Sequence, residues 1–121
     1  MQATRLIAIR HGETAWNVDT RIQGQLDVEL NDTGRWQAQQ AAQALRDEPL
    51  NAIYASDLAR AFVTATAIGD MAGLQPVPTP ALRERHFGIF QTRTWAEIEQ
   101  MWPGDALRWR TRDPDWAPEG G

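Results

Sequence analysis

The sequence predicts an α/β fold with a mainly parallel sheet. Short β-branched and aliphatic segments alternate with longer helix-forming segments, in the order strand, helix, strand, helix. Capping residues and helix-stopping residues separate these segments. The length of 121 residues is typical of a single domain. We therefore expect one domain over residues 1–121, with right-handed crossovers between its parallel strands.

The first strand is expected over residues 4–10, where aliphatic and β-branched side chains form a short run that ends at His11. A helix is expected over about residues 32–46, because Asn31 is a good capping residue and Ala and Gln dominate the segment. Pro49 marks its end. Residues that follow a strand of a parallel sheet lie where α/β proteins place their chemistry.

A second strand is expected over residues 51–55. Ser56 and Asp57 follow it and can cap a helix over about residues 58–72. A cap is the preferred interpretation of Asp57, and an ion pair with Arg60 is the alternative. Gly73 is expected to close this helix.

The rest of the chain predicts shorter elements. Prolines limit residues 75–80 to an edge strand or an extended loop. Thr94 and Glu97 form a capping-box pattern for a helix that Pro103 stops, and a further short helix is expected over residues 105–112.

Four tryptophans recur every seven residues in this region: Trp95, Trp102, Trp109 and Trp116. Pro103, Gly104 and Pro114 interrupt any continuous helix, which argues against a coiled coil. Packing of these rings in a core is favoured over a substrate lid.

Composition excludes several classes of function. The formal net charge is −4, so neither nucleic acid nor an anionic membrane is an expected partner. The absence of lysine excludes Schiff-base chemistry and a Walker-type phosphate loop. The absence of cysteine fits a reducing compartment, and the apolar run at residues 6–9 is too short for a signal-peptide core, so a cytoplasmic location is expected.

The residues after the first strand and the second helix predict phosphoryl transfer. A neutral imidazole at His11 can attack phosphorus, while the guanidinium groups of Arg10 and Arg60 can bind phosphate oxygens. Gly12 would let backbone amides approach an anion. Glu84 is a candidate acid for the leaving alkoxide. No histidine-rich or cysteine-rich spacing predicts a metal site.

These residues belong to an ordered set of motifs: Arg10-His11-Gly12-Glu13-Thr14-Ala15-Trp16-Asn17, Gln23-Gly24-Gln25-Leu26-Asp27, Leu30-Asn31-Asp32-Thr33-Gly34, Ser56-Asp57-Leu58-Ala59-Arg60-Ala61, Thr64-Ala65 and Leu82-Arg83-Glu84-Arg85-His86-Phe87-Gly88. The set resembles the histidine phosphatase superfamily, also called phosphoglycerate mutase-like, from Thr4 to the end of the chain. The resemblance implies a three-layer α/β/α fold with a mainly parallel sheet, of which this chain would hold an incomplete version.

The same resemblance implies the roles of the site residues. His11 would become the phosphohistidine, and Glu84 would act as general acid and then general base. The phosphate-binding residues would be Arg10, Arg60, Asn17, Gln23 and Gly24. Water would discharge the phosphohistidine, with no metal and no cofactor. The implied partner is a small phosphorylated metabolite.

The sequence departs from the family pattern in two places. A second histidine, followed by Gly on a later strand, is missing, so the chain is expected to be truncated at its C-terminal end, weakly stable and nearly inactive. The missing strand would leave an open sheet edge that invites a homo-oligomer or another partner. Gln91-Thr92 replaces the acidic residue and Gly of many relatives, which affects the turn there.

Three functions follow from this resemblance. A broad-specificity phosphatase that hydrolyses a phosphate monoester is preferred, because Gln23-Gly24-Gln25-Leu26-Asp27 is more similar to phosphatase members than to glycolytic mutases. Phosphoglycerate mutase activity is the first alternative. The second is an impaired chain that binds phosphorylated ligands or a partner without turnover.

Overall fold

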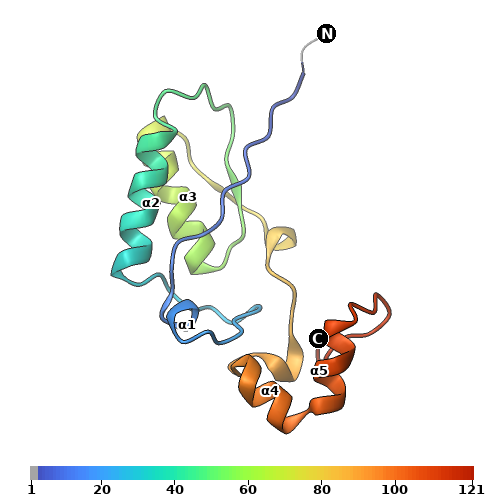
Figure 1. Cartoon of the computed structure of the whole chain (residues 1–121). Helices are drawn as coiled ribbons and strands as arrows, with labels where there is room; N and C mark the ends of the chain where they lie inside the picture. Colours follow the sequence, from blue (N-terminus) through green and yellow to red (C-terminus); the bar gives the residue numbers. More distant parts are fainter. Residues whose placement is uncertain (1–2) are drawn as a thin grey trace.

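The computed structural model describes residues 3–121, and Figure 1 shows their course. The described helices are α1 (Ala15–Val18), α2 (Asp32–Ala44), α3 (Ala59–Ala72), α4 (Trp95–Met101) and α5 (Pro103–Arg110), with single 3-10 turns η1 (Pro80–Leu82) and η2 (Gly88–Phe90). The described strands are β1 (Tyr54–Ala55) and β2 (Val77–Pro78). Helices α2 and α3 lie side by side, and α4 and α5 lie together near the C-terminus.

The parallel pairing of β1 and β2 confirms the expected sheet type. Tyr54 lies opposite Val77 and Ala55 opposite Pro78, so both expected segments, 51–55 and 75–80, contribute a short strand. Helix α3 forms the crossover between them, as the sequence order predicts.

The expected strand over residues 4–10 is wrong for the structure described. This segment is extended but belongs to no strand, and its aliphatic side chains are exposed, with Leu6 89% and Ile9 46% accessible. A strand needs a hydrogen-bonded neighbour, and within residues 3–121 no segment pairs with this one. The apolar pattern of residues 4–10 thus predicts an extended backbone, but it does not predict whether a neighbouring strand is there to pair with it.

Both long helices start close to their predicted positions. The Asn31 side chain accepts a hydrogen bond from the Gly34 amide at 2.7 Å and so caps α2. At the start of α3, Asp27 from another loop accepts the Ala59 amide at 2.7 Å. The prediction that Asp57 caps this helix is wrong, because that carboxylate pairs with Arg83 instead.

Glycine and proline positions explain where the other elements end. Gly73 closes α3 in the left-handed conformation, with φ 70°, as expected. Pro103 does follow α4, but it also opens α5 two residues before the predicted start, because proline suits the first turn of a helix. Thr92 has φ 77°, in a region that favours glycine, so the turn after Gln91 is strained.

Two apolar clusters stabilise the chain. The first lies between α2 and α3 and contains Leu30, Ala38, Ala42, Ala67 and Ile68. The second is centred on Phe90, which is fully buried with Ile98 and Ala106. The rings of all four tryptophans that recur every seven residues lie 6.0–6.4 Å from the Phe90 ring. This packing confirms the core interpretation of the tryptophan spacing.

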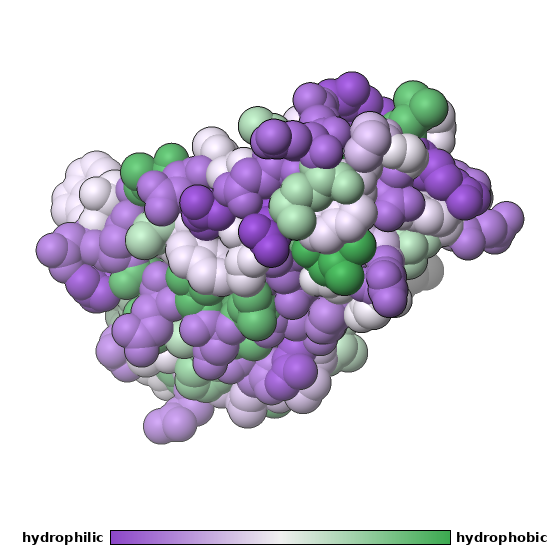
Figure 2. Space-filling model, turned by 90° about the horizontal axis from the view of Figure 1, so that it is seen from below, coloured by the Kyte–Doolittle hydropathy of each residue, from purple (hydrophilic) through white to green (hydrophobic). Residues whose placement is uncertain are grey.

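The surface is mixed in character. Figure 2 shows the face seen from below, where hydrophilic side chains predominate and apolar atoms form small separate clusters. Across residues 3–121, no helix combines the length and the apolar character that a membrane crossing requires.

Candidate functional site

The His11-Gly12 segment lies against the first turn of α2, and glycines on both sides make this approach feasible. A Cβ on Gly12 would lie 2.4 Å from the Gly34 carbonyl oxygen, and a Cβ on Gly34 would lie 2.1 Å from the Glu13 carbonyl oxygen. The Asn31 amide also donates to the Glu13 carbonyl at 3.0 Å. Backbone contacts therefore place residues 11–13 against the helix.

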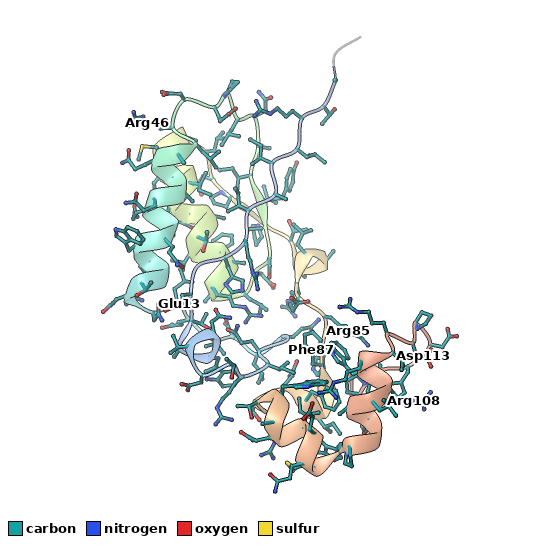
Figure 3. All side chains as sticks on the ribbon, viewed as in Figure 1. Glu13, Arg46, Arg85, Phe87, Arg108 and Asp113 are labelled. Carbon is teal, nitrogen blue, oxygen red and sulfur yellow. The ribbon has the colours of Figure 1, made fainter. Side chains whose placement is uncertain are left out.

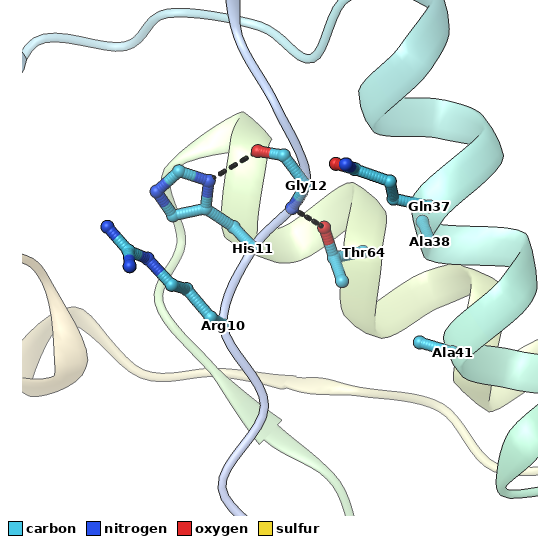
Figure 4. Close-up of a pocket in the computed structure, with 7 residues that line it drawn as sticks. All are labelled: Arg10, His11, Gly12, Gln37, Ala38, Ala41 and Thr64. Carbon is cyan, nitrogen blue, oxygen red and sulfur yellow. Dashed lines mark hydrogen bonds between the residues drawn. The ribbon is translucent and has the colours of Figure 1, made fainter. Parts of the chain in front are cut away.

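Helix α3 holds the same segment from the other side. The Gly12 amide donates to the Thr64 hydroxyl at 3.2 Å, and that hydroxyl donates to the Arg60 carbonyl at 2.8 Å (Figure 4). The Gly12 amide is therefore bonded within the protein, and the expectation that Gly12 lets backbone amides approach an anion stays a prediction. The glycine serves close packing, and its amide anchors the loop to α3.

The His11 ring has a defined tautomer. Its Nδ1 lies 2.6 Å from the Gly12 carbonyl oxygen, which can only accept a hydrogen bond (Figure 4). Nδ1 must therefore carry the proton, and Nε2 carries the free lone pair. Burial lowers the pKa of His11 below 6.5, and the positive charges of Arg60 and Arg10 lower it further. The hydrogen bond to the Gly12 carbonyl acts in the opposite direction and raises it. The ring is thus neutral at neutral pH, and its Nε2 lone pair is available for the predicted attack.

The Arg60 side chain is 3% exposed and is held by backbone carbonyls. Its Nη1 donates to the Leu26 carbonyl at 2.6 Å, and its Nη2 donates to the Gly24 carbonyl. Burial lowers the pKa of Arg60, while the negative charges of Glu84 and Asp27 raise it. An arginine stays charged under such conditions, so the site contains a buried, oriented cation.

Arg10 is exposed and shares two adjoining hollows with His11. The larger, of about 270 Å³, is lined by Arg10, His11, Gly12, Gln37, Ala38, Ala41 and Thr64. Figure 4 shows Arg10 and His11 on one side of the backbone and the α2 side chains on the other. The second hollow, of about 240 Å³, also includes Asn17. A small anion would fit either volume.

Asn17 and Gln23 both hold the loop around Thr14. The Asn17 amide oxygen accepts the Thr14 backbone amide at 2.9 Å, and the Gln23 amide oxygen accepts the Thr14 hydroxyl at 2.7 Å. Thr14 is fully buried. Both side chains thus use their amide oxygens to bind Thr14. A phosphate needs N–H donors, which the amide nitrogens of Asn17 and Gln23 would supply, and these contacts stay predictions.

Glu84 is exposed, and its charge acts on both His11 and Arg60. Its Oε1 accepts the Arg85 amide at 2.7 Å. The neighbouring Arg83 forms a two-bond ion pair with Asp57, 2.6 Å for each bond, which ties this segment to the start of α3. Glu84 is therefore near enough to both His11 and Arg60 for its charge to affect their pKa values.

Sequence reasoning missed the supporting role of two polar side chains. Thr64 lies one turn after Arg60 on α3 and binds Gly12. Gln37 lies one turn into α2, and its amide oxygen accepts the Glu13 amide at 2.9 Å. A polar residue one helical turn from a predicted site residue is the signal that would have found Thr64. Among residues 3–121, no three His, Cys, Asp or Glu side chains gather in a way that could hold a metal ion.

Comparison with known proteins agrees with a phosphoryl-transfer site. The sequence profile described as the histidine phosphatase superfamily (branch 1) matches residues 6–121. The chain is 46% identical over 121 residues to a glucosyl-3-phosphoglycerate phosphatase of Mycobacterium tuberculosis, covering 100% of this chain and 54% of the relative. It is 46% identical over 100 residues to phosphoglycerate mutase-like protein 4 of Arabidopsis thaliana, covering 81% and 44%.

Solved structures give the same result. A mycobacterial glucosyl-3-phosphoglycerate phosphatase in complex with VO3 superimposes with a TM-score of 0.85 and 46% identity, covering 92% of this chain and 53% of that one. The chain belongs to the histidine phosphatase superfamily, and its α/β fold is the corresponding part of a phosphoglycerate mutase-like domain. It spans about half the length of the curated relatives that it matches.

Proposed function

We propose that this chain carries the nucleophile and phosphate-binding residues of a phosphatase that hydrolyses a small phosphate monoester through a phosphohistidine. One observation carries the proposal: the Nδ1 bond to the Gly12 carbonyl leaves His11 Nε2 as the unprotonated nitrogen. Arg10 and Arg60 bind the phosphate oxygens, and Asn17, Gln23 and Gly24 complete the pocket. No metal or cofactor takes part.

The reaction consists of two displacements. In the first, the Nε2 lone pair attacks phosphorus, the phosphorus–oxygen ester bond breaks, and Glu84 gives its proton to the leaving alkoxide. In the second, the Glu84 carboxylate takes a proton from water, the oxygen attacks phosphorus, and the nitrogen–phosphorus bond breaks. The guanidinium groups offset the charge on the equatorial oxygens in both steps.

The substrate class follows from the relatives. Glucosyl-3-phosphoglycerate phosphatases match the whole chain, and this supports a phosphorylated glycerate derivative as substrate and water as the final acceptor. Mutase activity is the alternative, supported by the mutase-like relatives. Incubation with a phosphoglycerate separates the two, because a phosphatase releases inorganic phosphate and a mutase forms the isomeric ester.

Phosphorylation of His11 tests the proposal itself. The chain is incubated with a phosphate ester labelled with ³²P, quenched in alkali, and analysed for an acid-labile phosphoamino acid. We expect label on the unaltered chain and none on a His11→Ala variant. Label that persists in the variant, or an unlabelled unaltered chain with intact fold, would contradict it.

A second candidate function is ligand binding without turnover, with self-association through an open sheet edge. The exposed aliphatic side chains of residues 4–10 favour it, since an unpaired extended segment can add a strand to another copy. Light scattering tests this second candidate, and a monomer at all concentrations would rule it out.

A cytoplasmic location, without nucleic acid or membrane partners, belongs to the phosphatase proposal and is supported by the absence of cysteine and the acidic net charge.

A further inference from the structure

Gln91 lies outside the set of residues assigned to phosphoryl transfer, yet its side chain contacts the loop that holds Arg60. Its amide oxygen accepts the Gln25 backbone amide at 3.0 Å and the Phe87 backbone amide at 3.2 Å. Both partners are N–H donors, so the atom between them must be the oxygen of the side-chain amide. One acceptor therefore joins two segments that are far apart in the sequence.

We infer that Gln91 is a positioning residue that orients the Arg60 guanidinium and the Glu84 segment through these two backbone amides. The inference deepens the proposed function and rests on it. It concerns residues that act on the phosphate-binding groups, and it assigns to Gln91 no contact with substrate.

The path from Gln91 to Arg60 runs through Gly24. The Gln91 amide sits where a Gly24 side chain would be, because a Cβ there would lie 2.1 Å from the Gln91 amide oxygen. Gly24 has φ 55°, and its carbonyl accepts from the Arg60 guanidinium. The next residue, Gln25, gives its amide to Gln91. This turn is thus hydrogen-bonded to Gln91 through the Gln25 amide and to Arg60 through the Gly24 carbonyl.

A second path leads from Gln91 to Glu84. The Gln25 side-chain amide nitrogen donates to the Glu84 carbonyl at 3.2 Å. Phe87, three residues after Glu84, donates its backbone amide to Gln91. The Arg85 guanidinium lies over the Phe87 ring, 5.9 Å from its centre (Figure 3). Loss of the Gln91 oxygen would therefore release both the turn at Gly24 and the segment after the candidate acid.

The chemistry of position 91 predicts which substitutions preserve this function. A carboxylate has the same reach as the amide and also accepts hydrogen bonds. Leucine has a similar volume but no acceptor, so it would leave two amides without their partner. Gln91→Glu should therefore preserve the arrangement, and Gln91→Leu should disrupt it.

The test compares the unaltered chain, Gln91→Leu, Gln91→Glu and Gln40→Leu. Gln40 is an exposed glutamine on α2, so its variant controls for the general effect of the exchange. NMR measures hydrogen exchange of the Arg60 guanidinium protons, and titration calorimetry measures the affinity for inorganic phosphate. Gln91→Leu should speed the exchange and weaken phosphate binding by about tenfold each, and the other two variants should resemble the unaltered chain.

Equal guanidinium exchange in Gln91→Leu and the unaltered chain would overturn the inference, as would a Gln91→Glu variant as impaired as the leucine variant. If the unaltered chain binds no phosphate, the proposed function fails, and the exchange rates still decide the role of Gln91. If Gln91→Leu does not fold, amide exchange in the unaltered chain decides it. The Gln25 and Phe87 amides should then be protected, and rapid exchange of both would overturn the inference.

Discussion

Replacement of Thr64 by valine tests whether α3 holds the nucleophile loop. The Thr64 hydroxyl makes two bonds: it donates to the Arg60 carbonyl one turn earlier, and it accepts the Gly12 amide. Valine has nearly the same shape and makes neither bond. Thr66 offers a matched control on the same helix, because its hydroxyl also donates to the carbonyl one turn earlier, that of Phe62, at 2.8 Å.

The difference between the two valine variants isolates the bond to Gly12. Leaving a buried amide without its acceptor costs about 1–3 kcal/mol. Thr64 is 5% exposed, so water does not readily replace the hydroxyl. Unfolding entropy near 60 °C is about 2.1 cal/mol/K per residue, so each kcal/mol corresponds to about 4 °C in Tm for a chain of 121 residues. Thr64→Val should thus melt about 4–12 °C below Thr66→Val.

Thermal unfolding followed by circular dichroism measures this difference, and phosphate titration shows whether the loop has moved. We expect weaker phosphate binding in Thr64→Val than in Thr66→Val. Equal Tm values and equal affinities for the two variants would refute the reasoning that the hydroxyl of Thr64 holds His11 in place.

Three further predictions use the same chain. Thr92→Gly should raise stability by about 1 kcal/mol in urea unfolding, because Thr92 has φ 77° and only glycine adopts this region freely; no gain would contradict it. Asp57→Asn should lower stability at pH 7 and lower it by less at pH 3: the Arg83 hydrogen bond lowers the pKa of Asp57, so its contribution is complete above 3.8 and decreases as pH falls through the lower folded value. If Asp57→Asn lowered stability as much at pH 3 as at pH 7, the ion pair between Asp57 and Arg83 would not be the cause. The rate of His11 phosphorylation should be no lower at pH 6.5 than at neutral pH and should decline only at lower pH, because burial lowers the pKa of this ring; protonation also makes the folded state less stable as pH falls through that pKa. A decline that begins above pH 6.5 would argue against it.

Local patterns predicted most helices and the parallel pairing, because caps, turns and proline act over a few residues. Asn31 and Gly73 are such signals, and both lie where the sequence places them. The segment 4–10 shows the limit of these patterns, since pairing depends on a neighbour that no local pattern supplies.

The sequence predicted the main residues of the candidate site but not the contacts that hold them. The ordered motifs identified His11, Arg60 and Glu84 as candidates, and in the structure the charge of Glu84 acts on the other two; their catalytic roles stay predictions. The packing role of Gly12 was missed, because the Gly34 and Thr64 contacts come from helices whose distance to the loop depends on tertiary packing. The contacts of Gln91 depend on packing in the same way.

The identity of the phosphorylated nitrogen tests the central claim most directly. The chain is labelled at its histidines with ¹⁵N, phosphorylated by an ester, and studied by ³¹P and ¹⁵N NMR, which assigns phosphorus to one ring nitrogen. The Gly12 bond predicts that phosphorus is attached to Nε2 of His11, with Nδ1 still protonated. Phosphorus on Nδ1, or on a residue other than His11, would contradict the account.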